Sequence, residues 1–572
     1  MKARRTHRNA PAFRWRVFFL LGVLTLIALA LLARAVDLQL VEYSFLSGQG
    51  DARFTRVVSI PAHRGVITDR YGEPLAVSTP VDSVWVNPRQ ILRVPGAVRR
   101  LAAAVKIDPQ TLQRDISSNT HLDFLYVARQ LPPPRALRIK ALGIPGVYLS
   151  REYRRYYPGG EVTGQLIGFT NIDDRGRAGL ELAYDPWLTG IDGEKRVIED
   201  RYGRIVQDVD SIRPARPGRD LVLSIDLRIQ YLAYRALKAE VEEQRARSGA
   251  MVVLDIATGE VLAMVDQPGF NPNDRSQLLP NLYRNRAVTD VFEPGSSIKP
   301  FFIATALETG RYNDQSIINT SPGFIRVDGH VFRDEHDLGP VDIATILGKS
   351  SNVGMAHIAL SLPPQLIWTT LHAFGFGQLA TEGYPGEAAG DLSDYKDWRP
   401  IRIATMAHGY GISVTALQLA HAYATLGDYG VERPISFLRV NAPPAGRRIM
   451  PARLCRELLE MMRSVILPGS TAPLAAIPGY TVAGKTGTAW ELRDGTYDQN
   501  AHTAVFAGVA PASAPRLAAV VVLRDPRNGL YYGGDVSAPV FSKVVGRALR
   551  LMGVAPDEPV APARAVQMAS LQ

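Results

Sequence analysis

The sequence predicts an α/β (α+β) protein with one antiparallel sheet flanked by helices, preceded by a transmembrane helix and an irregular β-rich domain. Three observations lead to this prediction. The second half of the chain has strand-like segments at both ends and a mostly helical middle. The first half carries short β segments, and one long apolar run lies near the N-terminus. Strands at both ends of a helical middle imply a single antiparallel sheet covered on both faces.

Composition allows two to four globular domains in 572 residues. The net charge of +10 is mild, and six basic residues fall in the first sixteen positions. We therefore do not interpret the charge as a nucleic-acid footprint and predict no nucleic-acid partner. Cys455 is the only cysteine, which excludes an intrachain disulfide and a cysteine-based zinc site. The ten histidines show no metal-ligand spacing, so neither a metal nor a cofactor is predicted.

The apolar run is Val17–Ala33, seventeen uncharged residues that span ~25 Å as a helix. Arg34 can snorkel, so the predicted transmembrane helix covers 17–36. The basic tail, 1–16, is then cytoplasmic and all later residues lie outside the cytoplasm. A cleaved signal peptide is the alternative, because Ala33-Arg34-Ala35 resembles a cleavage site. The run is longer than a usual signal-peptide core, which favours a retained anchor.

Residues 37–215 contain no nucleophile paired with a base, and we predict a non-catalytic spacer or interaction domain. Arg64, Asp69 and Arg70 are expected to form structural charge pairs in a strand–turn–strand segment. Residues 97–145 look helical and amphipathic. A linker before the next domain is marked by Pro214, Pro217 and Gly218.

Residues 216–555 are predicted to form the sheet-containing domain, followed by a disordered tail over 556–572. A helix is expected over 227–246 and a closing helix over 536–552. The expected strands are Leu221–Asp226, Ala250–Asp255, Glu260–Asp266, Tyr480–Trp490, His502–Ala510 and Leu517–Arg524.

Ser296 opens an apolar helical run directly after the turn signal Pro294-Gly295. Lys299 lies three residues later, on the same helix face and one turn away. A serine hydroxyl becomes a good nucleophile only when a base takes its proton. A buried lysine can be that base, because burial disfavours its ammonium form. A helix N-terminus also offers free N–H groups to a developing oxyanion.

An isolated S-x-x-K is common by chance, but two further elements follow it in a fixed order. Ser350-Ser351-Asn352 lies in a second apolar stretch, and Lys485-Thr486-Gly487-Thr488 leads into strand-like sequence. S-x-x-K, a serine–asparagine element and K-T-G together are the signature of penicillin-binding proteins and class A β-lactamases.

Over nearly its whole length, the chain resembles a class B penicillin-binding protein, a membrane-anchored peptidoglycan D,D-transpeptidase. The resemblance implies a penicillin-binding transpeptidase domain over 216–555 and a pedestal or dimerisation-type domain over 37–215. Glu293-Pro294-Gly295-Ser296 looks like the septal, cell-division branch, whereas the elongation branch more often has Pro-Pro-Gly before its serine. Gly409–Thr415 and Gly533-Gly534 also look septal.

The family's roles carry over to matching positions. The resemblance implies that Ser296 attacks the bond between the last two D-alanines of a stem peptide and that Lys299 accepts its proton. Ser350 would pass a proton to the leaving D-alanine, with Asn352 holding Lys299 and the substrate amide. The substrate carboxylate would be held through the segment Lys485, Thr486, Gly487 and Thr488. Ser297, Ser351 and His408 are interpreted as structural, and Asn352 and Thr486 have a structural alternative.

The implied partners are stem peptides ending in D-Ala-D-Ala, β-lactams, and cell-division membrane proteins that include a septal glycosyltransferase. The implied location is the bacterial inner membrane, with a single span and a periplasmic catalytic domain. Three alternatives stay open: an elongation-type class B transpeptidase, a D,D-carboxypeptidase or serine β-lactamase, and a non-catalytic β-lactam sensor or divisome subunit. The anchor with its long spacer disfavours the hydrolases, and the complete set of motifs disfavours a dead site.

Overall fold

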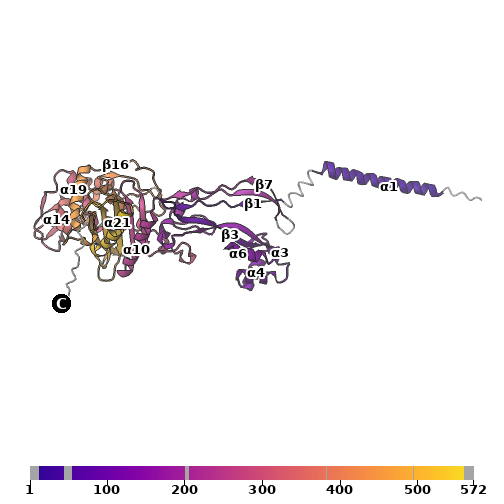
Figure 1. Cartoon of the computed structure of the whole chain (residues 1–572), viewed down its shortest axis with the longest axis horizontal. Coiled ribbons are helices and arrows are strands. Elements are labelled where there is room, and N and C mark those ends of the chain that lie inside the picture. Colours follow the sequence, from indigo (N-terminus) through magenta and orange to yellow (C-terminus); the bar gives the residue numbers. More distant parts are fainter. Residues whose placement is uncertain (1–11, 44–54, 200–204, 382, 494, 560–572) are drawn as a thin grey trace, which may run out of the picture. The chain divides into compact units, whose positions relative to one another are not determined.

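A computed structural model describes residues 12–43, 55–199, 205–381, 383–493 and 495–559 (Figure 1). Contacts divide the chain into two compact units. The small unit comprises residues 1–62, 80–152 and 191–216, and the large unit comprises 63–79, 153–190 and 217–572. The sequence placed one boundary at 215/216, whereas the contacts assign two earlier segments to the large unit. Strand pairing and buried ion pairs bind these two segments to the large unit.

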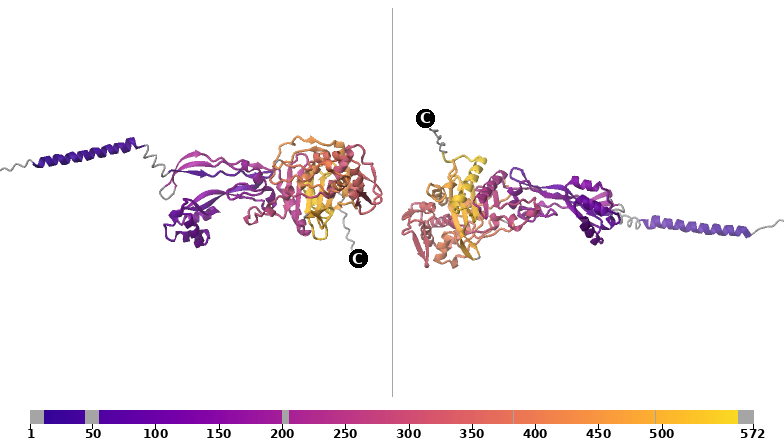
Figure 2. Two further views of the ribbon diagram at one scale, coloured as in Figure 1. Left: turned by 180° about the vertical axis from the view of Figure 1, so that it is seen from behind. Right: turned by 90° about the horizontal axis from the view of Figure 1, so that it is seen from below.

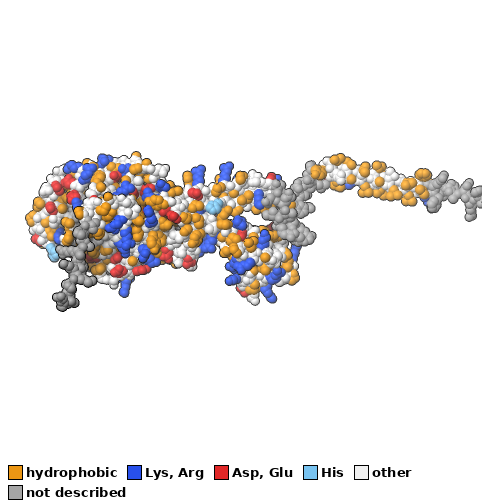
Figure 3. All heavy atoms as spheres, viewed as in Figure 1, with side chains coloured by type: hydrophobic (Ala, Val, Ile, Leu, Met, Phe, Trp, Pro, Cys, Tyr) orange, Lys and Arg blue, Asp and Glu red, His pale blue; other side chains and the backbone are white. Residues whose placement is uncertain are grey.

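The N-terminal helix α1 (Ala12–Val36) continues into the short π-helix η1 (Asp37–Val41). Residues 15–41 form a helix long and apolar enough to cross a membrane, with a mean hydropathy of 2.5 over its most apolar window, and none of that window is buried. In Figure 3 the side chains of this helix are almost continuously apolar. Arg34 pairs with Asp37 at its C-terminal end. The predicted 17–36 span lies inside this helix, while residues 1–11 of the predicted basic tail are outside the described residues.

The small unit contains a three-stranded antiparallel sheet and a separate helical lobe. The sheet has β6 (Gly193–Glu199) between β1 (Thr55–Ile60) and β7 (Ile205–Arg213). The lobe is built from α3 (Pro88–Ile91), α4 (Ala97–Val105), α5 (Pro109–Ser118), β4 (Leu125–Leu131) and α6 (Pro133–Lys140). Two further strands, β3 (Pro74–Val86) and β5 (Val147–Tyr156), cross the boundary between the units.

The sequence predicted helical structure over 97–145 with a break at Pro132-Pro133-Pro134, and this prediction is wrong over β4. Leu125–Leu131 pairs antiparallel with β3, with Val86 opposite Leu125. The lobe then packs Val84, Leu101 and Ile139 into its own core, together with other residues of α4, α5 and α6. Strand pairing and burial therefore decide the conformation of a segment whose composition favours a helix.

The large unit is organised around a five-stranded antiparallel sheet in the order β10-β9-β19-β18-β17. Its strands are β9 (Ser248–Asp255), β10 (Val261–Gln267), β17 (Ala483–Arg493), β18 (Thr496–Ala510) and β19 (Leu517–Arg524). Every residue of β9 and β10 is buried, so helices must cover both faces. The predicted antiparallel sheet is confirmed, and five of the six predicted strands lie in it, with ends that differ by up to six residues. The predicted strand Leu221–Asp226 is wrong in length and place, because only β8 (Leu221–Val222) is a strand and it pairs with β2 (Ile67–Thr68) outside this sheet. Strand β17 is an edge strand.

Helices α10 (Leu227–Glu243), α18 (Ala416–Gly427) and α21 (Ala538–Leu551) are the longest of the helices that pack on the sheet. Figures 1 and 2 show α10 and α21 side by side, and both contact the sheet. Helix α18 packs on β9, β18 and β19. All twelve residues of α18 are buried, which makes it the central helix of the unit.

The remaining elements surround this core. Those before the nucleophile segment are β2 (Ile67–Thr68), η2 (Gly160–Val162), α7 (Gly164–Ile167), α8 (Gly179–Ala183), α9 (Asp185–Leu188), β8 (Leu221–Val222), η3 (Arg275–Gln277), α11 (Pro280–Tyr283) and α12 (Arg286–Thr289). Those in the middle are η4 (Gly295–Ile298), α13 (Lys299–Glu308), β11 (Ile317–Asn319), β12 (Phe324–Val327), β13 (His330–Arg333), β14 (Pro340–Asp342), α14 (Ile343–Lys349), α15 (Asn352–Leu360), α16 (Pro364–Ala373), η5 (Tyr395–Asp397) and α17 (Pro400–Ala407). Those that follow are β15 (Val431–Glu432), β16 (Arg447–Arg448), α19 (Ala452–Met462), η6 (Arg463–Ile466), η7 (Pro473–Ala475) and α20 (Gly533–Val536).

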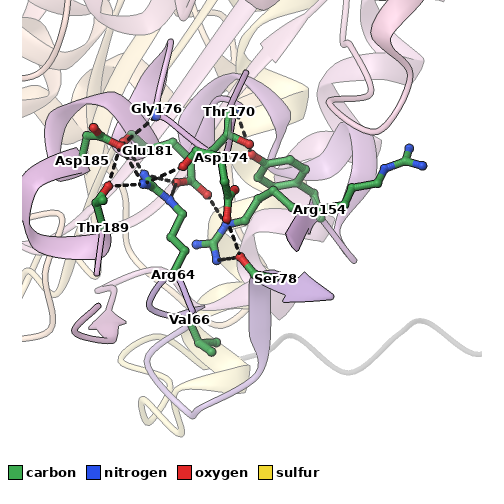
Figure 4. Close-up of polar contacts among 12 residues, drawn as sticks. Arg64, Val66, Ser78, Arg154, Thr170, Asp174, Gly176, Glu181, Asp185 and Thr189 are labelled. Atoms are coloured by element: carbon green, nitrogen blue, oxygen red, sulfur yellow. Dashed lines mark hydrogen bonds and ion pairs between the residues drawn. The ribbon is translucent and has the colours of Figure 1, made fainter. Parts of the chain in front are cut away.

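A buried ion network ties the two early segments into the large unit. Arg64 points into a group formed by Glu181, Asp185 and Thr189 (Figure 4). Its guanidinium lies 2.7 Å from Glu181 and 2.6 Å from Asp185, and Arg155 reaches the other oxygen of Glu181 at 2.6 Å. Arg64, Arg155 and Glu181 are almost fully buried. The predicted charge pairing of Arg64 is therefore confirmed.

The other two charges of this segment also have partners. Arg70 forms an ion pair with Glu260 at 3.1 Å. Asp69 instead accepts backbone N–H groups, from Tyr71 at 2.8 Å and Glu73 at 2.9 Å, and so closes the turn. Strand β2 pairs in parallel with β8, with Ile67 opposite Leu221, which binds the segment to the start of the main domain.

The C-terminal end is ordered beyond the predicted start of the tail. Asp557 accepts hydrogen bonds from the backbone N–H of Thr481 at 2.8 Å and from Ser513 Oγ at 2.5 Å. The rest of the predicted tail, residues 560–572, lies outside the described residues.

Candidate active site

Ser296 lies in the 3₁₀ turn η4, and α13 begins at Lys299. Residues Lys299 to Leu307 of this helix are all buried, so the apolar run that follows the serine forms a core helix. Ser296 is half-buried and remains accessible, whereas Ser297 is buried and donates to the carbonyl of Pro294 at 2.7 Å. Of the two adjacent serines, Ser296 is therefore the one available to a substrate.

Lys299 Nζ is surrounded by oxygen acceptors from the Ser350-Ser351-Asn352 segment. It donates to Ser350 O at 2.6 Å, to Asn352 Oδ1 at 2.9 Å and to Ser350 Oγ at 3.2 Å. Ser350 follows α14 in the left-handed region, with φ of 58°, a conformation that costs energy for a residue other than glycine. The structure thus brings together two of the sequence elements predicted to act jointly.

Burial lowers the pKa of Lys299 to about 7, and the negative charge of Asp334 opposes this effect. The acceptors in contact with Nζ are neutral carbonyl, hydroxyl and amide oxygens. A neutral amine is therefore accessible near physiological pH, and a neutral amine can accept a proton.

The third element lies on the edge strand β17, beside η4. Lys485 is fully buried and its Nζ donates to Thr486 Oγ1 at 3.0 Å. Burial and the nearby positive charge of Lys299 lower the pKa of Lys485. Thr488 is half-buried, and its Oγ1 accepts from the backbone N–H of Gly533 at 3.1 Å.

Glycines allow the segments to meet at this point. A Cβ on Gly487 would lie 2.3 Å from Pro294 O, and a Cβ on Gly409 would lie 2.0 Å from Gly295 O. Contacts this short do not occur for real Cβ atoms, so both positions require glycine. The close approach of β17 places Thr488 next to the backbone that carries Ser296.

Two family models match the chain. The model described as penicillin binding protein transpeptidase domain matches residues 249–546, and the model described as penicillin-binding protein dimerisation domain matches residues 59–223. The first alone covers more than half of the chain.

The chain belongs to the penicillin-binding protein family.

Relatives match this penicillin-binding protein along nearly its full length. It is 44% identical over 562 residues to the protein named peptidoglycan D,D-transpeptidase FtsI of Escherichia coli K12, covering 97% of this chain and 95% of the relative. The transpeptidase domain of Burkholderia pseudomallei penicillin-binding protein 3 is 40% identical, with a TM-score of 0.55, covering 59% of this chain and 98% of that structure. Penicillin-binding protein 3 of Mycobacterium tuberculosis, complexed with aztreonam, is 26% identical, with a TM-score of 0.68, covering 88% and 99%. The protein is a class B penicillin-binding protein with FtsI-like relatives.

Two further residues contact the motifs of this penicillin-binding protein: Asp334, which sequence reasoning missed, and His408, which it interpreted as structural. Asp334 accepts from Ser351 Oγ and from the backbone N–H of Asn352, both at 2.5 Å. His408 Nε2 lies 3.0 Å from Asn352 O, and because a carbonyl only accepts, Nε2 carries the proton. Asp334 belongs to no motif with a local spacing, so no sequence signal singles it out. Among the described residues, no group of three His, Cys, Asp or Glu side chains could hold a metal ion.

Proposed function

We propose that this protein is the septal peptidoglycan D,D-transpeptidase, which cross-links stem peptides through an acyl-enzyme on Ser296. The observation that carries the proposal is the environment of Lys299: a fully buried amine, one turn from an accessible serine, held by neutral oxygen acceptors. Such an amine is suited to general-base catalysis near pH 7. The 44% identity to the E. coli protein over nearly the whole chain supports the septal branch.

In the first half-reaction, Ser296 Oγ attacks the carbonyl carbon of the penultimate D-alanine of a stem peptide, and Lys299 Nζ takes the hydroxyl proton. The backbone N–H groups of Ser296 and Thr488 would stabilise the oxyanion, each donor being worth about 3 kcal/mol. The closeness of Thr488 to Gly295 supports this pairing. The C–N bond then breaks, and the terminal D-alanine leaves as an amine.

The leaving amine needs a proton, and we assign its delivery to Ser350. Ser350 Oγ accepts from Lys299 Nζ at 3.2 Å, so the proton taken from Ser296 can pass through Lys299 and Ser350. Asn352 holds Lys299 in place through Oδ1 and would also contact the substrate amide. The hydrogen bonds of these residues support the relay.

The terminal carboxylate of the substrate would bind at Lys485, Thr486 and Thr488. Within the described residues, the hydrogen bonds of Lys485 Nζ go to Thr486 and none goes to a carboxylate, and burial disfavours the ammonium form of Lys485. An incoming carboxylate supplies the missing counter-charge and raises the pKa of Lys485 again. Gly487 lets the strand come close enough for Thr488 to share this task.

In the second half-reaction an amine from a neighbouring stem attacks the acyl-enzyme, which gives ping-pong kinetics. β-Lactams resemble the D-alanyl-D-alanine end and would trap Ser296 as a long-lived ester.

We further propose that the helix over 15–41 crosses the bacterial inner membrane once, with the N-terminus cytoplasmic and the catalytic domain periplasmic. Cell-division membrane proteins, including a septal glycosyltransferase, are the proposed partners.

Labelling with a fluorescent penicillin tests the assignment of the nucleophile. Ser296→Ala should abolish the covalent label, whereas the matched control Ser297→Ala, at the buried serine beside it, should keep the label if the variant folds. Labelling of a folded Ser296→Ala variant would contradict the proposal.

Depletion in cells tests the branch. Loss of a septal enzyme gives filaments, because cells elongate without dividing. Round cells on depletion would instead assign the protein to elongation.

A further inference from the structure

Asp334 connects to the serine–asparagine element through three hydrogen bonds. The residue directly follows β13, and its carboxylate accepts from Ser351 Oγ at 2.5 Å and from the backbone N–H groups of Asn352 at 2.5 Å and Val353 at 3.1 Å. These two N–H groups open α15 and have no partner within that helix. The carboxylate therefore fixes the backbone position of Asn352.

Asn352 is held on its remaining sides as well. Its Nδ2 donates to Arg333 O at 3.2 Å, and its backbone carbonyl accepts from His408, whose ring stacks on Phe332 at 4.7 Å. The segment 332–334 thus contacts the main chain, the side chain and the histidine partner of Asn352. The Oδ1 of Asn352 accepts from Lys299 Nζ at 2.9 Å and so faces the reaction centre.

Three titratable groups act electrostatically on or near Lys299. Lys485 approaches from β17 and is cationic when protonated. His408 approaches from the end of α17, and burial together with the charge of Lys299 lowers its pKa to about 4, so it is neutral at pH 7. Asp334 is the acidic group of this set. When Lys299 takes the proton of Ser296, the ammonium that forms has Asp334 as its anionic counterpart.

We propose that Asp334 is a positioning residue for acylation, which holds Asn352 against Lys299 and stabilises the ammonium formed when Lys299 accepts the Ser296 proton. The inference rests on the proposed function. The proton moves from Ser296 Oγ to Lys299 Nζ, and Asp334 touches neither the substrate nor the reacting atoms. Its effect is electrostatic and acts through Asn352.

The test measures the acylation rate constant of the full-length protein with a chromogenic β-lactam between pH 5 and pH 9. Asp334→Asn removes the charge while keeping the shape. The acylation rate rises with pH as Lys299 loses its proton, and we call this rise the acid limb of the rate profile. Loss of the charge of Asp334 lowers the pKa of Lys299, so the acid limb should move to lower pH. The rate at the plateau should fall about tenfold or more, the effect of losing a hydrogen bond to a charged group. Asp334→Glu, which keeps the charge, should restore the position of the limb.

Ser351→Ala is the matched control, because it removes one hydrogen bond of Asp334 and the cap of α15 but leaves the charge. It should lower the melting temperature without moving the limb. An unmoved limb in Asp334→Asn, or an equal shift in Ser351→Ala, would overturn the inference and leave Asp334 as a structural cap. If the asparagine variant does not fold, Asp334→Ser gives the same readout with a smaller side chain.

The outcome also separates this inference from the proposed function. Mass spectrometry locates the β-lactam adduct in the wild-type protein. If the wild type is not acylated at Ser296, the proposed function fails. If the wild type is acylated there with an acid limb that Asp334→Asn leaves unmoved, only the role of Asp334 fails.

Discussion

At the scale of single residues, Lys299 differs from every surface lysine by what surrounds it. It is fully buried, with neutral acceptors around Nζ, and its pKa is lowered to about 7. Lys299→Met keeps much of the side-chain volume and removes the base. We expect acylation by penicillin to fall by about 10²- to 10⁴-fold, the usual contribution of a general base. Stopped-flow labelling measures the rate, and a melting curve verifies the fold; a folded variant that labels at a near-normal rate would show that another group takes the proton.

Asp266 offers a pH-dependent test of the core away from the active site. It lies in β10, where burial raises its pKa to about 7, and its Oδ2 has no hydrogen-bond partner, while Oδ1 accepts from Ala287 N at 3.0 Å. Because the folded state binds this proton more tightly than the unfolded state, its stabilising effect is present below about pH 4 and is lost as the pH rises towards 7. The loss amounts to about 4 kcal/mol.

Asp266→Asn replaces the protonated acid by an uncharged group of the same shape. We expect the variant to be more stable than the wild type at pH 8 and to show no advantage at pH 4. Thermal unfolding at pH 4, 6 and 8 measures the difference. Parallel stability curves for the two proteins would show that Asp266 does not titrate in this range.

Single functional residues could be predicted from the sequence where they lie at a short, fixed spacing along the chain. Ser296 and Lys299 lie within one helical turn, and the K-T-G residues are adjacent in one strand. The contacts of Asp334 and His408 with Asn352 could not be predicted, because only the chain's return through β13 and α17 brings these residues to Asn352. A lone Asp in a polar loop has no signal of its own.

At the scale of elements, the position of β17 against η4 depends on Gly487. Its Cβ would lie 2.3 Å from Pro294 O, so Gly487→Ala must push the edge strand away from the serine. We expect acylation to fall by at least about tenfold, because small misplacements of catalytic groups have large effects on rate. Gly269→Ala is the matched control, since its Cβ would meet no atom closer than 3.4 Å. Labelling of both alanine variants at the wild-type rate would contradict this role of Gly487.

The core strands could be predicted because strands buried on both faces appear as continuous apolar runs. Leu517–Arg524 was predicted with its observed ends. β4 could not be predicted, because Leu, Ala, Arg and Gln favour a helix, and the pairing of Val84 with Ala128 is a tertiary contact.

At the scale of the whole molecule, the segments 63–79 and 153–190 belong with the catalytic sheet, although the sequence grouped them with the spacer. Glu181 links them, because it is shared by Arg64 and Arg155. Glu181→Gln leaves two buried guanidinium groups without this anion. We expect the free energy of unfolding of the large unit to fall by about 3–5 kcal/mol.

The acylation rate of Glu181→Gln below its melting temperature should stay near that of the wild type, because, in the described part of the chain, the network of Arg64, Arg155 and Glu181 has no residue in common with the hydrogen bonds of Lys299. Glu460→Gln is the control, since Glu460 pairs with Arg463 at the surface with 71% of its side chain exposed. That change should alter stability by less than about 1 kcal/mol. Equal melting temperatures for the two variants would contradict a structural role of the network.

The central claim is that Ser296 carries an acyl group which is handed to an amine. The most direct measurement incubates the full-length protein with a peptide or depsipeptide mimic of the D-alanyl-D-alanine end and increasing concentrations of an acceptor D-amino acid. Mass spectrometry follows the adduct and both products. We predict an adduct on the peptide that contains Ser296, and a transfer product that grows at the expense of hydrolysis as the acceptor concentration rises. An adduct on another residue, or hydrolysis alone at every acceptor concentration, would contradict the account.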